Sequence, residues 1–263
     1  MSEQDRRLAA AVDIARTAGQ AALAFFRDID GLDISQKGTQ DWVSNADLEV
    51  ETLVRAEISK RFAEDGIVGE EHAPVASSSG WTWVIDPIDG TANFVVGLPQ
   101  WCVILACVRE DATRVGVIYD PCADEMFCAA EGQGARLNDR PVAVAKADAL
   151  NAGRVGLGMS GRPPVQGTPR LLSAVVEQDG RLFHNASGGL MLAYTAAGRL
   201  IAFAEPHMNA WDCLAGQLMV REAGGRTEQQ SADAMLVQGG RVIVAAPAVF
   251  DRLLAMADDA YKE

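Results

Sequence analysis

The 263-residue chain has few of the residues that build disulfide frameworks or structural zinc sites. It contains three histidines and five cysteines, and no two cysteines have the CxxC spacing of a zinc or redox motif. An odd number of cysteines without paired spacing is typical of free thiols in a reducing compartment. The sequence also lacks an apolar signal core in its first residues, and no apolar run approaches the ~20 residues of a membrane span. These absences predict a cytoplasmic protein that does not bind a membrane.

Basic residues are scarce as well. The chain has 23 Lys and Arg and 36 Asp and Glu, which gives a net charge of −13. A chain this acidic repels the phosphate backbone of nucleic acids, which argues against nucleic acid as its main ligand. Hydrophobic residues make up 49% of the chain, which is enough for a large buried core.

Hydrophobic periodicity organises the first half of the chain. Apolar residues at helical spacing predict helices over 3–26 and 46–62. Ser44 or Asn45 is the expected N-cap of the second helix. The polar stretch 31–45 between the two helices is expected to be a loop. Three apolar runs predict strands in the region that follows, at 103–108, 114–119 and 125–129.

The rhythm changes after about residue 146, where strand and helix patterns alternate and indicate a second α/β layer. Four helices are expected there, at 169–177, 189–197, 209–223 and 247–256. We therefore expect an N-terminal lobe over residues 1–145 and a C-terminal lobe over residues 146–263. The first lobe would supply Asp86 and Asp89 and the second would supply Asp212, so a site that uses these acids should lie where the lobes meet.

Two carboxylates stand three residues apart where a predicted apolar strand runs into a Gly-Thr turn. Pro87 follows Asp86 and cannot donate a ladder hydrogen bond, so the strand is expected to end there. That end would free the Ile88 carbonyl as a hard-oxygen ligand. Asp86 and Asp89 would repel each other when buried, so the motif predicts a divalent-metal site between them. The alternative for this segment alone is a strand end with Asp89 as a helix N-cap.

Residues next to this motif and far from it extend the pattern. Gly90 and Thr91 are expected to open a short helix whose N–H groups face an anion. Glu70-Glu71 follows a short apolar strand, and Asp212 begins a predicted helix. Taken alone, the paired glutamates are typical of a solvated turn and Asp212 is typical of a helix cap.

Together the motifs resemble the inositol monophosphatase family of magnesium-dependent, lithium-sensitive sugar phosphatases. The matching segments are Glu70-Glu71, residues 86–91, residues 211–216 and residues 222–225, in the same order and spacing. The resemblance covers nearly the whole chain. It implies an α/β (α+β layered) fold, namely the α-β-α-β-α sandwich of the inositol monophosphatase and fructose-1,6-bisphosphatase type, and a homodimer.

The resemblance also implies a cofactor and its ligands. It implies two or three Mg²⁺ ions per site, bound by Glu70, Asp86, the Ile88 carbonyl, Asp89 and Asp212. Carboxylate and carbonyl oxygens are the ligands that Mg²⁺ prefers, and the scarcity of His and paired Cys argues against softer metals.

Further residues take their roles from the same resemblance. Catalytic roles are implied for Thr91 and Asp47, which would orient the attacking water, and for Glu70. The Gly90 and Thr91 amides would bind phosphate. The remaining assignments are Lys37 and Asp41 on a catalytic loop, and Glu205 and Ser160 in the substrate pocket.

The expected reaction is direct in-line attack of metal-activated water on a phosphate monoester, with myo-inositol monophosphate as the leading substrate. An aspartyl-phosphate route through Asp86 is the mechanistic rival. Ile201 and the pair Ala186-Ser187 depart from commoner residues of the family. Histidinol phosphate, fructose 1,6-bisphosphate and 3′-phosphonucleotides therefore stay open as substrates. From a different class, a non-catalytic regulatory binding protein is the alternative.

Overall fold

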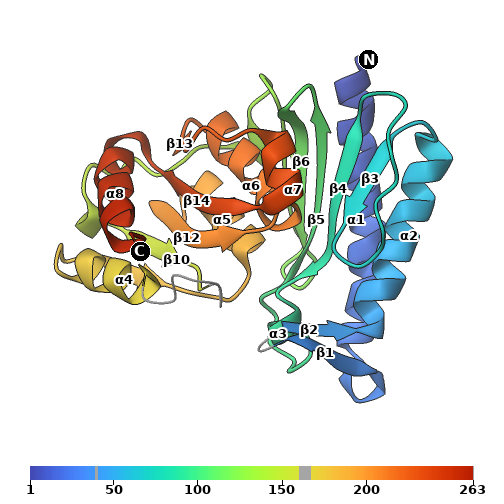
Figure 1. Cartoon of the computed structure of the whole chain (residues 1–263), viewed down its shortest axis with the longest axis horizontal. Coiled ribbons are helices and arrows are strands. Elements are labelled where there is room, and N and C mark those ends of the chain that lie inside the picture. Colours follow the sequence, from blue (N-terminus) through green and yellow to red (C-terminus); the bar gives the residue numbers. More distant parts are fainter. Residues whose placement is uncertain (39–40, 160–166, 263) are drawn as a thin grey trace.

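The computed structural model describes residues 1–38, 41–159 and 167–262. Its elements form five layers, in the order helix, sheet, helix, sheet, helix (Figure 1). This arrangement confirms the layered α/β sandwich. None of the described helices is both long enough and apolar enough to cross a bilayer.

The described helices are α1 (Glu3–Phe26), α2 (Asn45–Arg61), α3 (Thr91–Phe94), α4 (Gly167–Val176), α5 (Gly188–Ala196), α6 (Ala210–Glu222), α7 (Ala232–Gln238) and α8 (Pro247–Ala260). The large sheet has the strand order β3 (Gly66–Gly69), β4 (Thr82–Asp89), β5 (Cys102–Arg109), β6 (Ala112–Asp120), β7 (Glu125–Ala130), β8 (Ala135–Leu137) and β9 (Arg140–Val142). The small sheet has the order β11 (Arg181–Phe183), β10 (Arg154–Leu157), β12 (Ala202–Met208), β14 (Gly240–Ala245) and β13 (Arg226–Thr227). A separate ribbon pairs β1 (Ile34–Gly38) with β2 (Asp41–Ser44).

Side-chain alternation in the large sheet sends alternate residues into two different cores. On β4, Trp83 and Ile85 pack beneath α1 and α2, whereas Val84 faces α5 and α6 on the other side. The inward face of α1 is rich in alanine, which lets its backbone approach the sheet closely. Both faces of the large sheet are therefore covered by helices.

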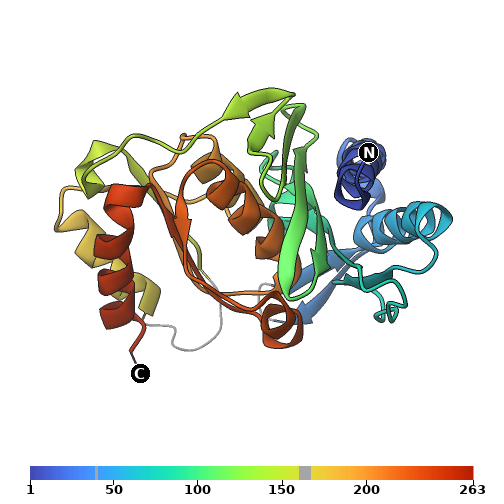
Figure 2. The same ribbon diagram turned by 90° about the horizontal axis from the view of Figure 1, so that it is seen from above.

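The middle layer packs closely, as the small residues of α6 predict. A Cβ on Gly116 of β6 would lie 2.8 Å from the Ala215 Cα, and one on Gly216 would clash with Leu192 of α5. Figure 2 shows these middle helices, in orange, between the green strands of the large sheet and the small sheet. The far face of the small sheet is covered by α4 and α8. This packing brings the beginnings of α5 and α6 beside the end of β4.

Two expectations about local structure are wrong. Residues 31–45 are not simply a loop, because β1 and β2 pair there as an antiparallel ribbon, with Gln36 opposite Trp42. Backbone hydrogen bonds stabilise such a ribbon without the apolar alternation that reveals a half-buried strand. The strand expected to end at Pro87 continues instead to Asp89, through a bulge. The predicted cap of the second helix is Ser44, whose N–H donates to Asp47 Oδ2 at 2.8 Å.

Candidate active site

The end of β4 carries two acids whose spacing is set by a β-bulge. Asp86 pairs with Ile104 of β5 and Asp89 pairs with Cys102, so β4 has one residue more than its partner over this stretch. The bulge accommodates Pro87, which has no N–H for the ladder. The Ile88 N–H instead donates to Asp86 Oδ1 at 3.0 Å. The local sequence thus bends the strand and holds the Asp86 carboxylate.

Thr91 begins α3 and reaches the first turn of α2. Its hydroxyl oxygen lies 3.1 Å from Asp47 Oδ1 and 2.9 Å from the Ile88 carbonyl oxygen, so one proton serves two acceptors. Asp47 is fully buried, which raises the pKa of its carboxyl, and hydrogen bonds from Ser44 and then from Thr91 oppose that rise. The structure therefore brings together Thr91 and Asp47, which lie 44 positions apart.

Gly90, between the acids and Thr91, adopts a φ of +95°, in the left-handed region that disfavours side chains. A Cβ there would lie 2.9 Å from the Gln100 carbonyl oxygen. Glycine is therefore needed at the position where the predicted phosphate-binding amides begin.

Glu51 of α2 accepts hydrogen bonds from the turn that carries Glu70. No motif in the sequence marks Glu51 as part of the site. The Glu51 carboxylate has no solvent exposure, and it accepts hydrogen bonds from the Glu71 N–H at 2.7 Å and the His72 N–H at 3.3 Å. Arg55, one turn further along α2, donates to Glu51 at 2.7 Å and to the His72 carbonyl at 2.9 Å. A side chain on Gly69 would clash with the Glu51 carboxylate. The i,i+4 spacing of Glu51 and Arg55 was the available sequence signal.

Asp212 lies in the first turn of α6, where its Oδ2 accepts the Asn209 N–H at 2.9 Å. Burial, and next the charge of Asp89, raises the pKa of Asp212. The pKa of Asp86 is raised well above its usual value, first by burial and then by the charges of Glu70, Asp89 and Asp212. These carboxylates of three separate segments therefore act on one another electrostatically.

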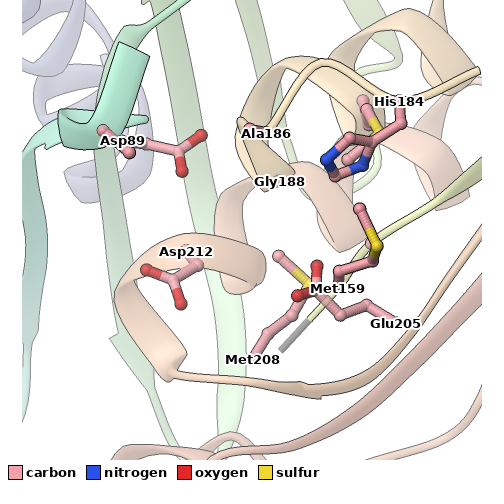
Figure 3. A pocket seen from close by; sticks show the side chains of 11 residues that line it. Asp89, Met159, His184, Ala186, Gly188, Glu205, Met208 and Asp212 are labelled. Atoms are coloured by element: carbon pink, nitrogen blue, oxygen red, sulfur yellow. The ribbon is translucent and has the colours of Figure 1, made fainter. Parts of the chain in front are cut away.

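A cavity of about 400 Å³ opens beside Asp89 and Asp212. In Figure 3 these two acids lie on one side of the cavity, and His184, Met159 and Glu205 lie on the other. Burial, and then the charges of Asp212 and Asp89, raises the pKa of Glu205 to about 8. The cavity thus has an acidic end and an opposite wall of mixed polarity, which includes the predicted substrate residue Glu205.

His184 is held in that opposite wall by its Nδ1, which lies 2.8 Å from the Leu157 carbonyl oxygen. Because a carbonyl only accepts, Nδ1 is the protonated nitrogen of this pair. No sequence motif singles out His184, because it has no ligand spacing to another histidine. Ser160, the other predicted pocket residue, lies outside the described residues. Lys37 and Asp41 belong to β1 and β2, where the structure describes their backbone and not their side chains.

The donor set fits a hard divalent cation in its chemistry. Buried carboxylates that raise one another's pKa values form a region where a cation would relieve repulsion. Among the described residues, however, no three His, Cys, Asp or Glu side chains form a ready-made cluster for a metal ion.

Five alternating layers, with acids gathered where the two sheets and the middle helices meet, define a sandwich of the layered phosphatase type. The model of the inositol monophosphatase family matches residues 3–262, and the chain belongs to this family. An inositol-1-monophosphatase of Mesorhizobium japonicum is 36% identical over 235 residues, covering 88% of this chain and 88% of the relative. The family is generally Mg²⁺-dependent.

Other similar proteins carry a different name. A Nus factor SuhB of Haemophilus influenzae is 32% identical over 247 residues, covering 93% of this chain and 92% of the relative. The crystal structure of the extragenic suppressor protein suhB from Bartonella henselae matches with a TM-score of 0.89 at 31% identity, covering 94% of this chain and 96% of that one. The comparisons therefore support a phosphatase family without identifying a substrate.

Proposed function

We propose that this protein is a Mg²⁺-dependent phosphate monoesterase whose first substrate is myo-inositol monophosphate. The observation that carries the proposal is a set of buried carboxylates close enough to affect one another's charge: beyond the effect of burial, Asp89 and Asp212 raise the pKa of Asp86, and Asp89 raises the pKa of Asp212. The Thr91–Asp47 hydrogen bond belongs to the same observation. Asp89 and Asp212 also line the cavity, where a phosphate ester could reach them. Family membership supports the same reaction class.

In this proposal the cation ligands are Glu70, Asp86, the Ile88 carbonyl, Asp89 and Asp212. Mg²⁺ bound by these residues would lower the pKa of a bound water and would offset negative charge on the phosphoryl and leaving-group oxygens. Glu70 is the acid that would share in activating the water.

The chain's own residues orient the reactants. Asp47 accepts the Thr91 proton, which leaves a lone pair of the Thr91 oxygen to accept a proton of the attacking water. The Gly90 and Thr91 N–H groups would hold the phosphoryl oxygens. Lys37 and Asp41 would contribute from the β1–β2 ribbon, and Glu205 would bind hydroxyls of the alcohol.

The finer assignments belong to the proposal as well. We assign a homodimer in the cytoplasm, lithium sensitivity and two or three Mg²⁺ ions per site, with an N-terminal lobe over 1–145 and a C-terminal lobe over 146–263. Ser160 would contribute to the alcohol-binding wall. Histidinol phosphate, fructose 1,6-bisphosphate and 3′-phosphonucleotides are the other substrates to be tested.

The name of the Haemophilus relative favours a second candidate function. A Nus factor name supports a regulatory binding role for this chain, through a protein partner. The net charge of −13 argues against nucleic acid as the main ligand of such a role. The presence of all the acidic residues that the proposal takes as metal ligands favours catalysis, although one fold can serve both roles.

Phosphate release from the four substrate types, with Mg²⁺ and with or without Li⁺, tests the catalytic proposal. The Asp89→Asn variant should lower turnover by about two orders of magnitude or more, because an amide is a poor substitute for a carboxylate ligand. Its circular dichroism should be unchanged. Asp259→Asn, which alters a side chain that is 85% exposed, is the matched control and should keep wild-type turnover.

Two results would contradict the proposal: wild-type turnover in Asp89→Asn, or no phosphate release from any of these substrates by the wild-type protein. The stereochemistry separates the two mechanisms. A chiral thiophosphate hydrolysed in oxygen-18 water should invert at phosphorus, whereas retention would indicate a phosphoenzyme on Asp86.

A further inference from the structure

The beginning of α5, which lies outside the large sheet, donates hydrogen bonds to the Asp89 carboxylate. Its Oδ2 accepts the Ser187 hydroxyl at 2.6 Å and the Gly189 N–H at 2.7 Å, and the Cys102 thiol lies 3.5 Å away. Ser187 has no solvent exposure. The contacts of Ser187 and Gly189 join residues that are 98 and 100 positions from Asp89, so only the folded chain forms them.

The direction of the Ser187 hydrogen bond follows from its other partner. As the N-cap of α5, the Ser187 oxygen accepts the Leu190 N–H at 3.3 Å. The hydroxyl proton is then available for Asp89, which as a carboxylate can only accept. Together with the Gly189 N–H, it gives Oδ2 two strong donors, in addition to the Cys102 thiol. The oxygen of Asp89 left for a cation is Oδ1.

The local backbone is shaped for this approach. A Cβ on Gly189 would lie 2.8 Å from Asp89 Oδ2, so a larger residue there would push the carboxylate away. Ala186 has a φ of +56°, a strained conformation for a residue with a side chain. The Asn93 side chain donates to the neighbouring Asn185 carbonyl at 2.7 Å and holds this turn in place. Figure 3 shows Ala186 and Gly188 beside Asp89, and all three residues line the cavity.

We propose that Ser187 is a positioning residue that restricts Asp89 to ligating Mg²⁺ through Oδ1 alone. The inference rests on the proposed function, because it takes Asp89 as a metal ligand. Outer hydrogen bonds of this kind orient ligating side chains, and their loss typically weakens metal binding by about 10–100-fold. Without the hydroxyl, Asp89 Oδ2 loses one of its two strong donors, and the Gly189 N–H and the weaker Cys102 thiol alone position the carboxylate. The same hydrogen bond ties the acidic end of the cavity to the α5 wall that the alcohol would contact.

The test is a calorimetric titration of the metal-free protein with Mg²⁺, without substrate. Ser187→Ala should bind Mg²⁺ about tenfold or more weakly than the wild-type protein. Ser187→Thr keeps the hydroxyl and should restore the affinity to within about threefold. Thr195→Ala is the matched control, because Thr195 is a second fully buried hydroxyl on α5, bonded to the Met191 carbonyl at 2.8 Å. Its loss should lower the midpoint of thermal unfolding without weakening Mg²⁺ binding.

The possible outcomes separate this inference from the proposed function. Wild-type Mg²⁺ affinity in Ser187→Ala, with Asp89→Asn impaired, would overturn the positioning role. Equal weakening in Ser187→Ala and Thr195→Ala would also overturn it, because general loosening of α5 would then be the cause. If the wild-type protein binds Mg²⁺ through Asp89 but releases no phosphate, the proposed function fails while the role of Ser187 is still measured. Absence of Mg²⁺ binding in the wild-type protein overturns both.

Discussion

The Glu205→Gln variant is expected to be more stable than the wild-type protein when no metal is bound and the pH is near 8. Burial, Asp212 and Asp89 raise the pKa of Glu205 from 4.5 to about 8 in the folded protein. Between these two values the folded state binds a proton that the unfolded state does not. The free energy of unfolding therefore falls as the pH rises from about 4.5 to about 8, because the unfolded state ionises freely.

The pKa shift sets the size of the effect. Each pKa unit corresponds to about 1.4 kcal/mol, so the rise from 4.5 to about 8 corresponds to about 5 kcal/mol. About 4 kcal/mol of this is reached at pH 8, where about half of the folded molecules still have a protonated Glu205. The carboxyl keeps some contact with the cavity, and local relaxation reduces such shifts, so we expect about half, or ~2 kcal/mol. Glutamine has nearly the same shape and no charge, and it removes this cost. At pH 5 the difference should be under ~1 kcal/mol, because the folded wild-type carboxyl is then protonated.

Urea unfolding at pH 5 and pH 8 with a chelator measures these differences. Glu177→Gln, which alters an exposed glutamate, is the control and should change stability by less than ~0.5 kcal/mol at either pH. Added Mg²⁺ should shrink the advantage of Glu205→Gln, because a cation near Asp89 and Asp212 favours the ionised form. A variant that is less stable than wild type at pH 8, or equally stabilised at both pH values, would refute the electrostatic reasoning.

Two further outcomes follow from the contacts of α2 with Thr91 and with the Glu70 turn. Thr91→Ala removes the hydroxyl bonded to Asp47 and should lower kcat about 100-fold while changing the Mg²⁺ affinity less than threefold. Steady-state kinetics at several Mg²⁺ concentrations measures both quantities, and an unchanged kcat would contradict the role of the hydroxyl. Gly69→Ala forces a methyl group against the Glu51 carboxylate and should destabilise the protein by ~1–3 kcal/mol in urea unfolding. Wild-type stability in Gly69→Ala would show that Glu51 does not hold the Glu70 turn.

The elements that sequence predicts well are those whose signal is local. The amphipathic pattern over 3–26 corresponds to α1, and its helix begins and ends at the predicted residues. The ribbon β1–β2 was missed because its strands are paired by backbone hydrogen bonds rather than by an alternating apolar face. The prediction from Pro87 was wrong for a related reason. The rule that proline ends a strand does not allow for a β-bulge, in which a residue without an N–H can lie outside the hydrogen-bonded ladder.

The same distinction applies to the candidate site. Asp86 and Asp89 are visible in sequence because their spacing is local. Ser187 carries no such signal, and the i,i+4 pair of Glu51 and Arg55 shows only a helical ion pair, because the roles of Ser187 and Glu51 come from contacts with segments that are distant in the chain. Ser187 alone reads as an ordinary helix cap, and only the structure shows that its proton is directed at Asp89. Residues that hold other residues in place are therefore the ones that sequence reasoning misses.

The acids of the cavity are only partly compensated by the fold, and this imbalance fits a protein that binds a cation. Asp89 accepts hydrogen bonds at the beginning of α5, and Asp212 lies in the first turn of α6, where helix dipoles favour negative charge. These contacts oppose desolvation, yet the pKa of each carboxyl is still raised. The fold thus stabilises the acids enough to keep them in place without cancelling their charge. Full compensation by arginine or lysine would stabilise the metal-free protein further, but it would remove the attraction for Mg²⁺ on which the proposed reaction depends.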